Sequence, residues 1–314
     1  MKATFYLHED TLACSKEIDK QEYVKRLGDL LKDISYIVDD KTDENDIRIS
    51  EGIYTAQIFD GIGFVDFAVS ELDRDEQTAF FKILYDSDKC ESFKVEDIEP
   101  LTHYQRGESQ CHALMVINQK PATDKLEADD SDLRIPFMQF DKYEIVYDRT
   151  SWLTVRRQIL GNHPGMPYEF IDKCKHYFGN LDFGLDCVET LENHLLFVPR
   201  KIVYYLACMN DCLLDFWKEH TNKNSPKIYC ADFAGRCKMD KAGSPQGSKK
   251  EKAEEYSFRF KDGLKLKCGA HFKITHIDDN CNDAEAQKSE KFHSRIYFAI
   301  YKDKIHVGSI GRHV

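Results

Sequence analysis

The stretch SRIYFAIYKDKIHVGSIGRHV, residues 294–314, reads as two β-strands joined by a tight turn. Apolar and polar side chains alternate along both halves, which is the period of a strand with one buried face. A turn at residues 302–303 brings the apolar side chains of both strands onto the same face. This register pairs Ile300 with Ile305 and Phe298 with Val307.

The segment EYSFRFKDGLKLKCG, residues 255–269, predicts a second hairpin. A two-residue loop would mix polar and apolar faces, whereas a three-residue loop ending on a left-handed Gly263 keeps them apart. That loop pairs Phe258 with Leu266 and places Arg259 opposite Lys265. A further strand, HFKITHI at 271–277, follows.

Together these segments predict one antiparallel sheet with two unlike faces. We expect one face to be apolar and buried: Phe258, Phe260, Leu264, Leu266, Phe272, Ile274, Ile296, Phe298, Ile300, Ile305 and Val307. We expect the other face to be basic and accessible: Arg259, Lys265, Lys267, His271, Lys273, Arg295, Tyr297 and His306. Arg312 and His313 are expected to fold back over it, since Gly308 and Gly311 precede them.

The basic face has the side chains that an RNA or nucleotide site needs. Arginine and lysine hold phosphates, and tyrosine stacks on a base. Histidine can move the proton of a ribose 2′-hydroxyl. Arg295 is expected to matter most because its guanidinium can grip a phosphate with two parallel hydrogen bonds. The alternative is the solvated face of an ordinary antiparallel sheet.

Charge is distributed unevenly along the 314 residues. Residues 225–314 hold 18 Lys and Arg against 12 Asp and Glu, a charge of +6, while residues 1–224 hold 26 against 43, a charge of −17. A basic segment on an acidic body favours a polyanionic partner. Mutual attraction of the two parts explains the asymmetry equally well.

The preceding sequence predicts two further domains and an α+β fold class. Residues 1–133 mix a helix at 20–38, a strand-rich stretch at 47–69 and a helix that Asp73 caps. Residues 134–237 are mainly helical, with Pro167 and Pro199 each opening a helix. A linker at 238–255, rich in Gly, Ser and charge, separates them from the basic β domain at 256–314.

Composition favours a folded cytoplasmic protein. The apolar fraction of 42% is that of a globular chain, and no apolar run is long enough to cross a membrane. The N-terminus lacks the pattern of a signal peptide. The eleven cysteines lack paired CxxC spacing, which favours buried thiols over a zinc site. The basic face has no carboxylate cluster, so the sequence predicts neither a metal nor a cofactor.

The order of charged hairpin, HFK, RIYF and IHVGSIGRHV resembles small bacterial toxins of the RelE/ParE superfamily. The likeness covers about the last 60 residues. It implies a compact antiparallel sheet, preceded by helices, that cuts mRNA on the ribosome by metal-independent acid–base chemistry. Carried over, Arg295 would stabilise the phosphate, Lys273 would support it, and His306 or His313 would act as acid or base. The remaining chain is similar, by analogy, to bacterial abortive-infection or phage-defence proteins.

Three hypotheses follow for function. The first is a toxin or defence effector whose acidic body restrains a ribonuclease domain, with Arg295, His306, His271, Lys273 and His313 as catalytic residues. The same hypothesis makes Tyr297, Arg259, Lys265, Lys267 and Arg312 binding residues. The second is a non-catalytic module that binds nucleic acid or a regulatory protein. In the third, the basic sheet docks on the chain's own acids, such as Asp129, Asp130 and Asp132.

Overall fold

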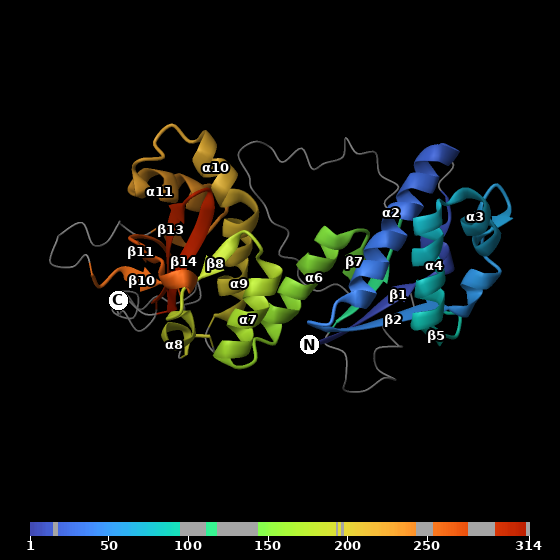
Figure 1. Cartoon of the computed structure of the whole chain (residues 1–314), viewed down its shortest axis with the longest axis horizontal. Coiled ribbons are helices and arrows are strands. Elements are labelled where there is room, and N and C mark those ends of the chain that lie inside the picture. Colours follow the sequence, from blue (N-terminus) through green and yellow to red (C-terminus); the bar gives the residue numbers. More distant parts are fainter. Residues whose placement is uncertain are drawn as a thin grey trace, which may run out of the picture. The chain divides into compact units, whose positions relative to one another are not determined.

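A computed structural model describes residues 1–14, 18–94, 111–117, 144–192, 194–195, 198–242, 254–275 and 293–311. The fold class is α+β, as predicted. The described residues divide into two compact units, one ending at Ile159 and the other beginning at Leu160 (Figure 1). We expected three domains, but the helices after Leu160 and the terminal sheet lie together in unit 2. Residues 118–143 and 243–253, which include most of both predicted linkers, lie outside the described ranges.

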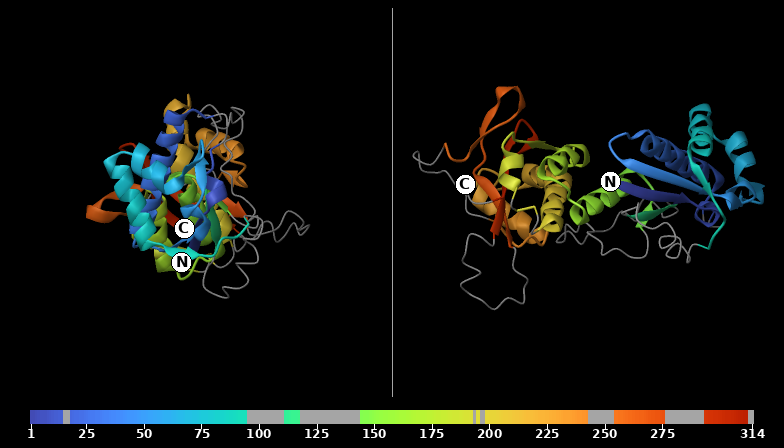
Figure 2. Two further views of the ribbon diagram at one scale, coloured as in Figure 1. Left: turned by 90° about the vertical axis from the view of Figure 1, so that its right-hand side faces the viewer. Right: turned by 90° about the horizontal axis from the view of Figure 1, so that it is seen from below.

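Unit 1 is built on a five-stranded sheet in the order β5-β2-β1-β6-β7, in which every neighbouring pair is parallel. Helices α2 and α4 lie across the sheet (Figures 1 and 2). The elements are β1 (Lys2–Leu7), α1 (Glu9–Leu12), α2 (Lys20–Asp39), β2 (Glu44–Ser50), η1 (Glu51–Tyr54), β3 (Gln57–Phe59), β4 (Ile62–Gly63), α3 (Phe64–Glu71), α4 (Arg74–Asp86), β5 (Asp88–Cys90), β6 (His112–Met115), β7 (Glu144–Val146) and α6 (Arg149–Asn162).

The predicted start of the helix at Asp73 is confirmed. The Asp73 side chain accepts a hydrogen bond from the Glu76 backbone N–H, and the Glu76 carboxylate accepts one from the Asp73 backbone N–H, which completes the predicted capping box of α4. The strand-rich expectation for 47–69 is wrong at its end, because α3 begins at Phe64. Phe64, Phe67 and Ala68 have helical spacing and are buried together in the core.

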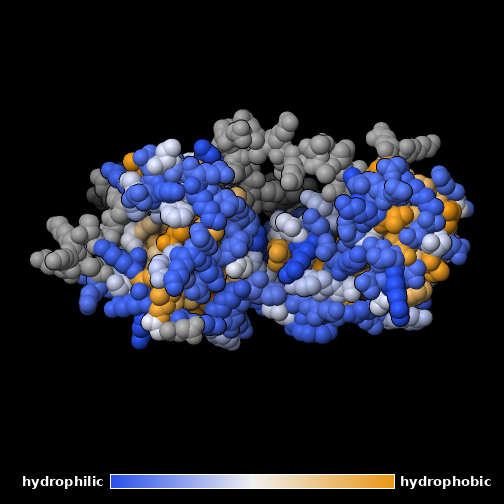
Figure 3. All heavy atoms as spheres, turned by 45° about the horizontal axis from the view of Figure 1, so that its top comes forward, coloured by the Kyte–Doolittle hydropathy of each residue, from blue (hydrophilic) through white to orange (hydrophobic). Residues whose placement is uncertain are grey.

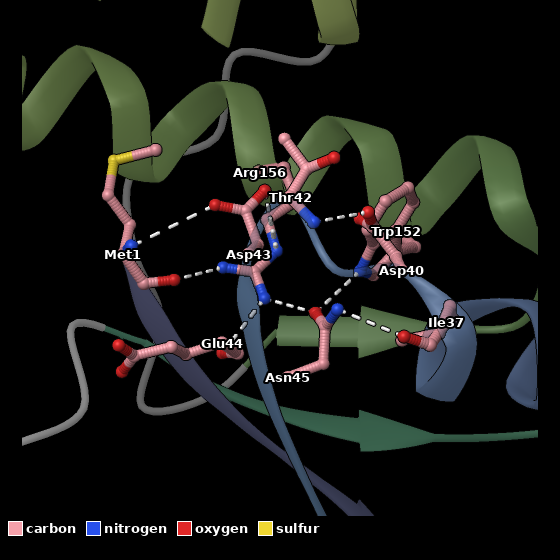
Figure 4. Close-up of polar contacts among 9 residues, drawn as sticks. All are labelled: Met1, Ile37, Asp40, Thr42, Asp43, Glu44, Asn45, Trp152 and Arg156. Atoms are coloured by element: carbon pink, nitrogen blue, oxygen red, sulfur yellow. Dashed lines mark hydrogen bonds and ion pairs between the residues drawn. The ribbon is translucent and has the colours of Figure 1, made fainter. Parts of the chain in front are cut away.

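A buried arginine joins α6 to the amino ends of β1 and β2 (Figure 4). The Arg156 side chain donates to the carbonyl of Met1 at 2.7 Å, to the carbonyl of Glu44 at 3.2 Å and to the Asn45 side chain. Its Nε lies 3.9 Å from a carboxylate oxygen of Asp43, and both side chains are fully buried. Trp152, one turn earlier on α6, donates to the same Asn45 oxygen. This network is the polar part of the unit 1 core.

Unit 2 places helices before a second five-stranded sheet, in the order β8-β14-β13-β12-β9. Strands β12, β13 and β14 are antiparallel, and β8 joins the edge of β14 in parallel. The elements are α7 (Pro167–Tyr177), β8 (Leu181–Phe183), α8 (Cys187–Leu191), α9 (Pro199–Cys208), η4 (Met209–Leu213), α10 (Leu214–Glu219), α11 (Pro226–Arg236), β9 (Lys241–Ala242), β10 (Ser257–Arg259), η6 (Lys261–Gly263), β11 (Lys265–Lys267), β12 (Ala270–Thr275), β13 (His293–Tyr301) and β14 (Lys304–Gly311).

Both predicted hairpin registers are confirmed. Phe258 pairs with Leu266 around a loop that ends on Gly263 at φ +73°, and Phe298 pairs with Val307. Lys302 and Asp303 both have positive φ, as a tight hairpin turn requires. Pro167 and Pro199 are the first residues of α7 and α9.

The described surface is mostly hydrophilic, with hydrophobic residues gathered in small patches on the face shown in Figure 3. No helix in the described ranges is both long and apolar enough to span a bilayer.

Candidate functional site

The antiparallel pairing in unit 2 brings most of the predicted site residues onto one face of the sheet. Strands β12 and β13 place His271 opposite Tyr297 and Lys273 opposite Arg295. On β14, Ser309 lies opposite Tyr297, and His306 lies opposite Ala299. We call the side chains of His271, Lys273, Arg295, Tyr297, His306 and Ser309 the polar face.

The polar face is covered, which corrects the expectation of an accessible basic surface. Arg295 is 6% exposed, His306 5%, and His271 and Tyr297 0%. On the opposite, apolar face, Phe272, Ile274, Ile296, Phe298, Ile305 and Val307 are buried as expected, whereas Ile300 is only half-buried. Phe272 is in ring contact with Tyr205 of α9 and Phe233 of α11.

Over Tyr297 and His306 the cover is the hairpin β10–β11, which forms a two-stranded sheet of its own (Figure 2). Phe258 and Phe260, expected on the same face as Phe298, instead join Tyr256 and Cys268 in a cluster around Tyr297, and Leu264 and Leu266 pack half-buried against that cluster. The Phe260 ring also meets His306 edge-on, with centroids 5.1 Å apart. The aromatic side of the hairpin is more stable packed against the sheet than exposed to water. Both faces of the sheet are therefore covered.

A bulge in β14 makes room for this cover. The register shifts after Tyr297, so that Gly308 has no partner on β13. A Cβ atom at Gly308 would lie 2.4 Å from a ring carbon of Phe258 and 2.9 Å from the sulfur of Cys268. The hairpin can therefore pack closely only on glycine at this position.

We expect Gly308→Ala to lower the free energy of unfolding by about 1–3 kcal/mol, the usual cost of overpacking. Thermal melting measures it against Gly179→Ala, where a Cβ would meet nothing within 4 Å. Equal melting temperatures for the two variants would mean that the hairpin moves away from a Cβ atom at position 308 at little energetic cost.

Three buried polar groups on the polar face have no hydrogen-bond partner among the described residues. They are Nε and Nη1 of Arg295, Oγ of Ser309 and Nε2 of His306. By register, Ser309 lies between the other two along the sheet. Two buried guanidinium nitrogens without a described partner are costly, so Arg295 fits an anion at this position.

His306 is held by a residue that the sequence did not indicate. Its Nδ1 lies 3.0 Å from Oδ2 of Asp182, which β8 places directly beside it. Asp182 precedes His306 by 124 residues, so only the parallel pairing of β8 reveals it. Ser309 was also missed, because strict alternation would place it on the side of Ile305 and Val307, and only the bulge at Gly308 brings it beside Tyr297.

The predicted binding cations separate from the polar face. Arg259, Lys265 and Lys267, together with Lys261, are exposed on the hairpin that covers it. Arg259 lies 3.6 Å from the carboxylate of Asp186. Arg312 and His313 fall outside the described residues.

Metal ligands do not gather in the described part of unit 2. There, no three histidine, cysteine or acidic side chains converge closely enough to hold an ion. The ten cysteines within the described ranges are free, and each is buried or half-buried.

A second candidate site is the carboxyl edge of the parallel sheet in unit 1, because open α/β sheets bind ligands at that edge. Here the Glu9 carboxylate accepts a hydrogen bond from Ser92 at 2.6 Å. Burial disfavours the charged form, but hydrogen bonds from Ser50 and Ser92 outweigh it and hold the pKa of Glu9 below its usual value. His8 donates to the Phe93 carbonyl at 2.5 Å, so these side chains bind one another.

No protein-family model, curated protein or solved structure matches the chain.

Proposed function

We propose that unit 2 is an RNA-cleaving module that works without a metal ion and acts as the effector part of a bacterial toxin or defence protein. The observation that carries this proposal is Arg295, buried at 6% exposure with two nitrogen atoms lacking partners among the described residues. A phosphate is an anion that matches a guanidinium in shape and charge. The helices that precede the sheet in unit 2 agree with the resemblance to RelE/ParE toxins.

The proposed reaction is a transesterification, in which the neighbouring 2′-hydroxyl oxygen attacks the phosphorus of the phosphodiester. His306 takes the proton from that hydroxyl while its oxygen bonds to phosphorus. The bond from phosphorus to the 5′ oxygen breaks, and His271 returns a proton to that oxygen, so no net proton is gained or lost. Arg295, with Lys273 beside it, stabilises the charge that develops on the phosphate.

Substrate must reach a face that the hairpin β10–β11 covers, so the hairpin has to move away during the reaction. Its outer side carries Arg259, Lys261, Lys265 and Lys267, all exposed. These cations attract the phosphate backbone without reading sequence. RNA would thus bind first to the hairpin and then to the face beneath it. On this proposal the protein is cytoplasmic, with RNA, the ribosome or a regulatory protein as partners.

The second candidate function is nucleic-acid or protein binding without catalysis. One observation favours it: the hairpin cations are exposed, whereas His271, Arg295 and His306 are buried. Binding without catalysis needs only the exposed cations of the hairpin.

Cleavage of RNA separates the two candidates. Purified protein is incubated with labelled single-stranded RNA in the presence of EDTA, and induced expression in bacteria is followed by growth. We expect cleavage that leaves 2′,3′-cyclic phosphate ends, and growth arrest. RNA binding with no cleavage and no arrest would favour the second candidate.

Removing hairpin charge tests the binding step. We expect Lys261→Ala with Lys265→Ala to weaken RNA binding, and to reduce the slope of log affinity against log salt by up to about 1.4, at roughly 0.7 per lost phosphate contact on a single strand. The matched control removes two exposed lysines of α10 and α11, Lys218 and Lys227. Fluorescence anisotropy at several salt concentrations measures both. An equal loss in the control would show that net charge, not the hairpin, binds RNA.

A further inference from the structure

The pair formed by Asp182 and His306 is set by strand pairing rather than by chance contact of surface side chains. Strand β8 lies parallel to β14, with Leu181, Asp182 and Phe183 beside Ile305, His306 and Val307. The side chain of His306 is 7% exposed and that of Asp182 28%. The backbone of both residues is therefore fixed, and only their side-chain torsions are free.

The contact decides which ring nitrogen of His306 carries the proton. An ionised carboxylate only accepts hydrogen bonds, so Nδ1 of His306 must donate to Oδ2 of Asp182 across 3.0 Å. In the neutral ring Nε2 then has a free lone pair. This is the atom that is buried and has no partner among the described residues.

We infer that Asp182 is a positioning residue that holds His306 in the Nδ1–H tautomer, so that Nε2 accepts the proton of the substrate hydroxyl. The inference rests on the proposed function. It assigns the base to His306 rather than His271, because in the described structure a carboxylate orients His306. The arrangement follows the general pattern in which a carboxylate fixes the imidazole of a catalytic base.

The Phe260 ring, edge-on to His306 at 5.1 Å, closes the imidazole off from water in the covered state. Burial of the imidazole strengthens the carboxylate–imidazole contact, since little solvent competes for His306. The ring orientation therefore exists before RNA arrives and needs no rearrangement of Asp182.

The tautomer is measured first, in the wild-type chain, by ¹⁵N NMR of labelled histidine, with the His306 signals identified from a His306→Gln sample. We expect Nδ1 to carry the proton in the neutral ring, and Asp182→Ala to return the ring to the Nε2–H form usual in water. A wild-type ring that is protonated at Nε2 overturns the inference, without any variant having to fold.

The second test of the inference measures the kinetics of RNA cleavage. We expect Asp182→Asn to lower kcat for RNA cleavage by at least about 10²-fold with KM nearly unchanged, because phosphate binding does not involve it. Asp172→Asn on α7, an exposed carboxylate in the same unit, is the control. If the wild type cleaves RNA and Asp182→Asn cleaves it equally fast, the dyad is overturned and the proposed function stands. If the wild type does not cleave RNA, the proposed function falls and the catalytic role of Asp182 falls with it.

Discussion

Replacing Arg295 by alanine is expected to lower RNA cleavage by about 10²–10³-fold, the usual loss when a group that stabilises developing charge is removed. The same change is expected to leave the chain as stable as before, or more stable. Arg295 is buried, with 6% of the residue exposed, and its Nε and Nη1 have no partner among the described residues. Removing a buried charge of that kind relieves a desolvation cost.

Arg295→Met separates the charge from the packing, because methionine fills most of the same space without a cation. Thermal melting and cleavage assays are run on both variants, with Arg200→Ala on α9, an exposed arginine, as the control. A large drop in melting temperature for Arg295→Met would show that the guanidinium has a structural partner. Full cleavage by Arg295→Ala would place the site elsewhere.

Replacing Arg156 by methionine is expected to destabilise unit 1 by about 3–5 kcal/mol, the cost of removing one partner from a buried ion pair. The buried Asp43 side chain would lose its ion pair with Arg156 and keep the one at 3.8 Å with the Met1 amino group, and the carbonyls of Met1 and Glu44 would lose the Arg156 donor. Arg156 and Arg295 are both buried, but Arg156 donates to three described oxygen atoms through Nη1 and Nη2, whereas Nε and Nη1 of Arg295 have no described partner.

The two tryptophans make this effect measurable within the intact chain, because Trp152 belongs to unit 1 and Trp217 to unit 2. In a Trp217→Phe background, Trp152 fluorescence during urea unfolding follows unit 1 alone. Arg149→Met is the control on the same helix, since Arg149 is exposed and its hydrogen bond to Tyr36 is at the surface. An unfolding midpoint for Arg156→Met equal to that of Arg149→Met would contradict the prediction.

The parts of the fold that were predicted correctly are those that neighbouring residues decide. Gly263 and the turn at 302–303 fix the two hairpin registers, and Asp73 fixes the start of α4. Turn geometry and alternation leave little freedom at such places. Five residues of the polar face, His271, Lys273, Arg295, Tyr297 and His306, were therefore grouped correctly, because a register places every second side chain on one side. Ser309 was missed, since the bulge at Gly308 breaks that alternation.

What covers each face depends on contacts between distant segments, and alternation does not contain that information. A strand with polar residues on one side looks the same whether water or an aromatic hairpin lies above it. Phe258 and Phe260 were placed on the wrong side for this reason. The parallel order of the unit 1 sheet and the partner of His306 were also missed, since both join segments far apart in sequence.

The pairing of β8 with β14 has a consequence for synthesis. The two strands are separated by more than 120 residues, and β8 leaves the ribosome long before its neighbour in the sheet exists. Contacts of such long range form late and slowly. A growing chain that has passed Asp182 but not reached His306 holds one member of the histidine–carboxylate pair without the other. Arrested or truncated products of translation would therefore be inactive, and the activity would appear only after unit 2 has completed its slow closure.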